Sequence, residues 1–117
     1  MEEGDYSAAY ALNKESLVIR RELGERRQIA YSLVGVAEAV AALGSFLSAA
    51  RIWGAAERLR EEIGSPLAPN ERTGYDRRVG AACAALGDDA AFDHARQEGR
   101  ALSLDEAIAF AMQTKGE

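Results

Sequence analysis

The stretch GSFLSAARIWGAAERLREEIGSPL, residues 44–67, decides the fold. It consists of a long run of good helix formers between Gly44 and Gly64, with a proline shortly after the second glycine. Glycine suits the left-handed position that ends a helix, and proline cannot continue one. Apolar residues in the run recur at the three- and four-residue spacing of one helix face. The stretch therefore predicts one amphipathic helix, which carries Trp53.

The composition of the whole chain predicts a single all-α domain. The chain has 117 residues, enough for one core, and its two prolines and 28% charged residues favour helices. No apolar run approaches the roughly 20 residues of a membrane span, and the first residues lack the features of a signal peptide. The single cysteine, Cys83, cannot form an internal disulfide and fits a reducing compartment. We therefore expect a cytoplasmic location and no membrane contact.

Charge and motif content argue against two classes of function. The net charge is -5, and no segment has the basic excess that phosphate binding needs. We therefore expect no direct nucleic-acid binding by this piece. No Ser-His-acid triad, paired carboxylates or glycine-rich phosphate loop can be assembled from the sequence. The predictions are thus no enzyme activity, no catalytic residues, no metal and no cofactor.

Helical periodicity extends over the rest of the chain. The other predicted helices cover residues 4–24, about 27–43, 69–86, 88–99 and 103–113. The first is expected to bury a stripe formed by Ala9, Leu12, Ser16, Ile19 and Leu23. The second has two apolar faces and so predicts two neighbouring helices. The last begins with a capping box, Ser103 to Glu106, and is expected to cover the end of the stack.

An internal repeat organises these helices into antiparallel hairpins. Residues 4–24 match residues 44–64 at both terminal glycines and along the core stripe, and Ala85-Leu86-Gly87 repeats Ala42-Leu43-Gly44. Shared packing roles predict matches at such positions. In this scheme the chain begins with the second helix of a repeat.

The same residues resemble known repeat proteins. Residues 4–64 resemble tetratricopeptide repeats, through Ala30, Tyr31, Leu33 and Gly35 and the turn pattern at residues 43–50. A longer pattern is similar to the C-terminal repeat region of bacterial ATPase-type transcriptional regulators, LuxR-like and AfsR/SARP-like. It comprises residues 32–37, 43–44, 49–67 and 101–108, together with Glu71, Arg72 and Tyr75.

This resemblance implies a fold, a subdivision and a function. The fold would be a tetratricopeptide-like right-handed superhelix of antiparallel hairpins, about five to six helices in a single domain over residues 1–117. Residues 4–24 would be the second helix of a truncated repeat, 26–64 a complete repeat, 68–99 a degenerate repeat and 103–113 a capping helix. The function would be a non-catalytic protein-interaction or ligand-sensing module of a bacterial transcription or signalling regulator. Its partner would be a protein, a peptide or another domain of the regulator.

Several side chains have both a binding and a packing interpretation. The candidate partner-binding residues are Arg20, Arg27, Tyr31, Trp53, Arg58 and Arg60. Packing is the alternative for the two aromatic residues, and solvated ion pairs for the arginines. Cys83 is expected to be a small buried residue rather than a reactive thiol, and His94 with Glu98 a surface pair rather than a metal site. A second hypothesis is a homodimer formed through an uncovered face of the first helix.

Overall fold

Six helices and their connections make up the described part of the chain. The structure, a computed structural model, describes residues 3–113, with side chains described from residue 7 onward. The helices are α1 (Glu3–Leu23), α2 (Arg26–Ala42), α3 (Phe46–Ile63), α4 (Pro69–Leu86), α5 (Asp89–Arg100) and α6 (Leu104–Gln113), and no strand occurs in this range. The predicted all-α class is confirmed. None of these helices has the length and apolar character needed to cross a membrane.

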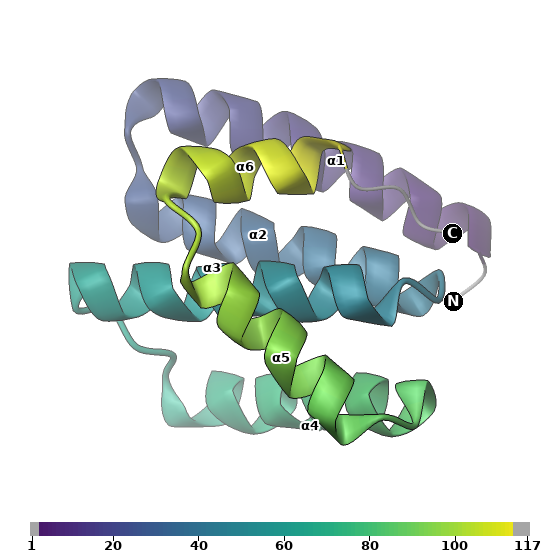
Figure 1. Ribbon diagram of the computed structural model, residues 1–117. Coiled ribbons are helices and arrows are strands. Elements are labelled where there is room, and N and C mark those ends of the chain that lie inside the picture. The colour runs from purple at the N-terminus through teal and green to yellow at the C-terminus, as the bar shows by residue number, and fades with distance from the viewer. Residues whose placement is uncertain (1–2, 114–117) are drawn as a thin grey trace.

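Helices α1, α2 and α3 form successive antiparallel layers (Figure 1). The inner helix, α2, packs closely on both α1 and α3, as its two apolar faces predict. Ile29, Leu33, Val36 and Val40 form one fully buried stripe, while alanines with small side chains occupy the other face. Gly64 ends α3 in the left-handed conformation, with φ of 63°, as its position in the sequence predicts.

Helix α5 crosses α3 at backbone contact (Figure 1). A Cβ atom added to Gly54 would lie 2.1 Å from the carbonyl oxygen of Arg96, and one added to Gly99 would lie 1.8 Å from that of Arg51. Two glycines thus permit the close approach. Beside the crossing, the ring of Trp53 meets those of Tyr75 and Phe92, each at a centroid distance of 6.4 Å.

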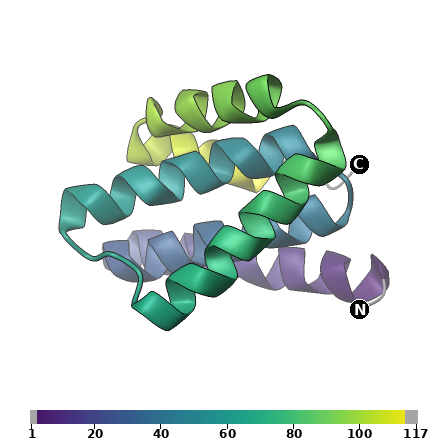
Figure 2. The ribbon, with the colours of Figure 1, turned by 90° about the horizontal axis from the view of Figure 1, so that it is seen from below.

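Helices α4 and α6 lie against this framework in different places. Seen from below, α4 runs diagonally across the layers (Figure 2). It contacts α3 and α5, and its buried residues are Tyr75, Val79 and Ala82. Helix α6 turns back to contact α3, α2 and α1, so it covers the side of the layers rather than extending them. The predicted capping box starts α6: Ser103 Oγ accepts from the Glu106 amide at 3.1 Å, and Glu106 accepts from the Ser103 amide at 2.8 Å.

The predicted buried stripe of α1 is wrong at its three large apolar residues, whereas Ala9 and Ser16 are half-buried. Leu12, Ile19 and Leu23 are 65%, 54% and 64% exposed, whereas Leu17 is fully buried. The buried side of α1 is the one that faces α2, where the hydroxyls of Ser16 and Ser32 are 2.9 Å apart. Periodicity locates an apolar stripe but cannot tell which side of a helix has a neighbour.

Candidate functional site

Two adjoining hollows open where α4 diverges from α3. They have volumes of about 250 and 340 Å³, and both are lined by Val34, Arg60, Leu67 and Tyr75. We call the combined depression the Arg60 groove. It exists because a five-residue linker, residues 64–68, separates α3 from α4, so that the two helices splay apart.

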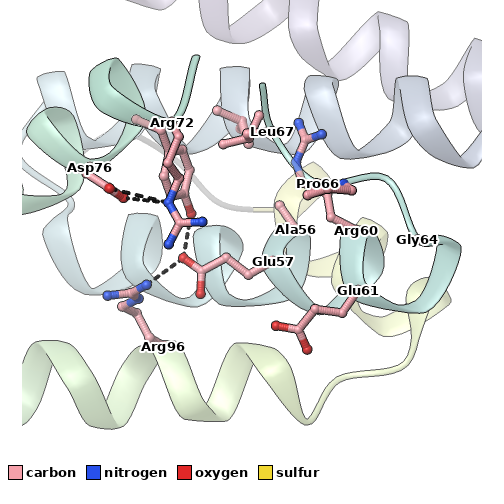
Figure 3. A pocket seen from close by; sticks show the side chains of 12 residues that line it. Ala56, Glu57, Arg60, Glu61, Gly64, Pro66, Leu67, Arg72, Asp76 and Arg96 are labelled. Atoms are coloured by element: carbon pink, nitrogen blue, oxygen red, sulfur yellow. Dashed lines mark hydrogen bonds and ion pairs between the residues drawn. The ribbon is translucent and has the colours of Figure 1, made fainter. Parts of the chain in front are cut away.

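One wall of the groove is tied together by the Glu57 carboxylate (Figure 3). Glu57 on α3 accepts from the Tyr75 hydroxyl of α4 at 2.6 Å and from Arg96 of α5 at 2.5 Å. Burial, and then the adjacent Glu57 carboxylate, raise the pKa of Tyr75 well above its usual range, so the phenol remains a donor. The other oxygen of Glu57 lies 3.7 Å from Arg100 of α5, so this carboxylate joins three helices and is not free to act as a base.

Arg60 lines both hollows of the groove and has an unusual environment for a cation. The residue is 7% exposed, and its guanidinium lies 4.5 Å above the centroid of the Tyr31 ring. Its Nη2 atom is buried without a hydrogen-bond partner among the described residues. The Arg60 side chain points away from Glu57 and Glu61 (Figure 3). The hydroxyl of Tyr31 donates to Glu71 at 3.2 Å. Arg60 is therefore a buried cation supported by an aromatic ring.

The acidic residues around Arg60 are already engaged elsewhere. Glu38 pairs with Arg78 at 2.7 Å, Asp76 with Arg72 at 3.2 Å and Glu61 with Arg100 at 2.6 Å. The hydrogen bond from Arg100 lowers the pKa of Glu61, so this pair is charged at neutral pH. Glu71 differs from these acids, since within the described part of the chain it accepts only from the Tyr31 hydroxyl and the Ala68 amide. The groove thus offers apolar walls and one cation without a carboxylate partner among the described residues, a combination suited to binding an anion rather than to acid–base chemistry.

The structure brings two of the six predicted partner-binding residues together in the groove, Tyr31 and Arg60. Arg20 pairs with Glu25 at 2.6 Å, and Arg27 is exposed at the start of α2. Arg58 lies elsewhere and donates to the carbonyl of Arg100 at 2.8 Å.

Trp53 has no exposed surface to offer a partner. It is 1% exposed and packs in the core, the alternative that its apolar surroundings in the sequence also suggest. Sequence reasoning missed the groove residues Val34 and Leu67, because their exposure depends on how α4 crosses α2 and α3. No local pattern signals that crossing.

The remaining candidates lie outside the groove. Cys83 is half-buried, and its thiol donates to Asp89 at 3.3 Å; that hydrogen bond, followed by burial, raises the pKa of Cys83. His94 is 77% exposed and lies 3.7 Å from Glu98. Within the described part of the chain, no three His, Cys, Asp or Glu residues are placed to hold a metal ion.

Comparison with known proteins gives one kind of relative. The chain is 41% identical over 75 residues to helix-turn-helix (HTH)-type transcriptional regulators of Mycobacterium tuberculosis and Mycobacterium bovis. The match covers 64% of this chain and 8% of each relative, so the chain spans a small part of their length. No family model and no solved structure matches the chain.

These relatives correct one prediction made from the sequence. Direct nucleic-acid binding was not expected, yet the relatives are named for the helix-turn-helix, a DNA-binding motif. The net charge of -5 belongs to this chain alone, whose match covers 8% of each relative. Charge balance over so short a span is therefore no ground for excluding DNA as a partner. The chain is similar to a segment of bacterial transcriptional regulators.

Proposed function

We propose that the chain is a non-catalytic sensing module of a DNA-binding transcriptional regulator in the bacterial cytoplasm. In this proposal the helices form a tetratricopeptide-like stack, and occupation of the Arg60 groove changes how the rest of the regulator acts. The groove is built from α2, the α3–α4 linker, α3 and α4, so a bound group would contact several elements at once. The relatives' names support the regulatory role.

One observation carries the proposal: Arg60, a residue that is 7% exposed, lines an open groove, and its guanidinium has no carboxylate partner among the described residues. A buried charge is costly unless it is paired. A protein that needed Arg60 only for folding would be expected to pair it internally. The unpaired donor therefore favours a role in binding.

Transcription in cells tests this proposal. The gene would carry Arg60→Met, which removes the charge but keeps a long apolar side chain in the groove. We expect RNA sequencing to show altered expression of genes that also respond to deletion of the gene, at an unchanged amount of protein on immunoblots. The matched control is Arg77→Met, which removes a charge from an exposed position of α4. Wild-type transcript levels in the Arg60→Met cells, with a clear response to deletion, would rule out the sensing role.

A second candidate function is self-association through α1. Leu12, Ile19 and Leu23 are each more than half exposed, and exposed apolar faces of this kind favour association. A dimer about a two-fold axis could cover the face with its own copy.

Sedimentation velocity of the 117-residue chain distinguishes this candidate. Self-association predicts a wild-type dimer that becomes monomeric when Leu12 and Ile19 are both replaced by Gln. A wild-type monomer at all concentrations would eliminate the dimer as the function of this face.

A further inference from the structure

We infer that the Arg60 groove binds a small organic acid with a single carboxylate and a largely apolar body. This inference rests on the proposed sensing function, because it names the class of ligand that the groove would sense. The carboxylate would meet the guanidinium of Arg60, and the apolar body would lie among Val34, Leu67 and the ring of Tyr75.

Arg60 lines both hollows, and its Nη2 atom is buried without a hydrogen-bond partner among the described residues. The Tyr31 ring covers a face of the guanidinium at 4.5 Å, and stacking of this kind leaves the in-plane N–H groups free. Those groups form a planar fork that matches the two oxygens of a carboxylate. The hydrogen bond from Tyr31 to Glu71 fixes the ring, so the fork is positioned before a ligand arrives.

The charge around the groove selects a monoanion. Arg60 is the cation in the lining whose guanidinium has no acidic partner among the described side chains, because Arg72, Arg78 and Arg96 pair with Asp76, Glu38 and Glu57. The Glu71 carboxylate also lines the groove; it accepts from the Tyr31 hydroxyl and the Ala68 amide but has no cationic partner among the described residues, so a second negative charge on a ligand would be unfavourable. A doubly charged phosphate would bring its second charge close to carboxylates that are already present in the lining.

The dimensions and walls of the groove select a small, partly apolar body. The two hollows, of about 250 and 340 Å³, are close to the lower end of the range of small-molecule sites. Aliphatic side chains and the Tyr75 ring supply apolar contact area next to the cation. A branched or aromatic acid of about ten non-hydrogen atoms would satisfy both features.

Titration with matched probes tests the ligand class. Phenylacetate, its neutral analogue phenylacetamide and inorganic phosphate would each be titrated into the 117-residue chain, with ¹H–¹⁵N NMR spectra as the readout. We expect phenylacetate to shift the amide signals of Tyr31, Arg60 and Leu67 with a Kd on the order of 1 mM, the range for a fragment of this size. Phenylacetamide should bind at least about tenfold more weakly, because it lacks the charge that Arg60 recognises. Phosphate should not compete.

Variants distinguish recognition by Arg60 from nonspecific binding of the probe. Arg60→Met should weaken phenylacetate binding about tenfold, to the level of the amide, whereas Arg77→Met should bind as the wild type does. Circular dichroism checks that each variant is folded. Should Arg60→Met not fold, Tyr31→Leu provides the second test: it keeps the cation but removes its aromatic support, and should also weaken phenylacetate binding.

Several results would overturn the inference. Among the probes, these results are the absence of saturable shifts with phenylacetate, or an affinity for phenylacetamide or phosphate equal to that for phenylacetate. Among the variants, the result is wild-type affinity for phenylacetate in both Arg60→Met and Tyr31→Leu. Altered transcription in Arg60→Met cells without carboxylate binding would remove the ligand class and leave the sensing function. Carboxylate binding together with unchanged transcription would remove the sensing function and leave the ligand class.

Discussion

Arg60 is held by an aromatic ring where a carboxylate would be the usual partner. A desolvated cation–π contact contributes about 2 kcal/mol, whereas burying a charge costs several kcal/mol. The Tyr31 ring therefore offsets only part of the cost of burying Arg60. Binding sites commonly carry such a cost, because a ligand then supplies the missing partner.

Cys83 provides a residue-scale prediction about reactivity. The hydrogen bond to Asp89 raises the pKa of the thiol, so less thiolate is present at a given pH than for a free cysteine. We expect Asp89→Asn to lower this pKa and to speed alkylation by iodoacetamide, with the rate-against-pH curve shifted to lower pH. Asp93→Asn is the matched control, since Asp93 makes the smallest contribution to raising this pKa. Identical curves for wild type and Asp89→Asn would contradict the role of the hydrogen bond.

At the scale of elements, the crossing of α3 and α5 depends on glycine. Gly54→Ala would place a Cβ atom 2.1 Å from a backbone carbonyl, which cannot move aside as a flexible side chain can. We expect a loss of about 3 kcal/mol in the free energy of unfolding, measured with urea. Gly80→Ala is the control, because open space surrounds that position and alanine favours helix; it should gain about 0.5–1 kcal/mol. Equal stability of the two variants would show that the helices can separate at no cost.

The capping box at the start of α6 gives a second prediction for an element. Ser103→Ala removes the acceptor for the Glu106 amide and should destabilise the chain by about 1 kcal/mol. Hydrogen bonds from Ser103 lower the pKa of Glu106 below its usual 4.5. A lowered folded-state pKa means that the carboxylate stabilises the fold above pH 4.5, and that this contribution is lost as the pH falls through the folded-state value.

The pH dependence of unfolding tests the capping carboxylate. The stability difference between wild type and Glu106→Gln should be present at pH 7 and should shrink as the pH falls below 4.5. A difference that stays constant across this interval would mean that the charge of Glu106 has no part in capping α6.

The elements themselves were predictable, whereas their contacts were predictable only in part. Terminal glycines, the Ser103 capping box and apolar spacing locate the helices, because those signals are local. The stripe of Leu12, Ile19 and Leu23 on α1 misleads, since burial requires a neighbour that local pattern cannot supply. Of the groove, the sequence indicates Tyr31 and Arg60 as residue types suited to binding. Their meeting depends on α2 and α3 packing side by side.

At the scale of the whole molecule, layering and divergence together produce the groove. Helices α1 to α3 pack as layers, and α5 locks against α3 through glycine, whereas the linker of residues 64–68 lets α4 cross at a distance (Figure 2). Arg60 points into the space that results. The fold therefore keeps an open groove beside a core in which Trp53, Leu33 and Ile52 are fully buried.

The free energy of unfolding of Arg60→Met, measured with urea beside the wild type, tests most directly whether Arg60 serves binding or folding. Because a guanidinium buried without a carboxylate partner is replaced by an apolar side chain of similar length, we expect equal or greater stability for the variant. A loss of about 3 kcal/mol, the usual effect of breaking a buried ion pair, would show that Arg60 supports the fold and would contradict its role in binding.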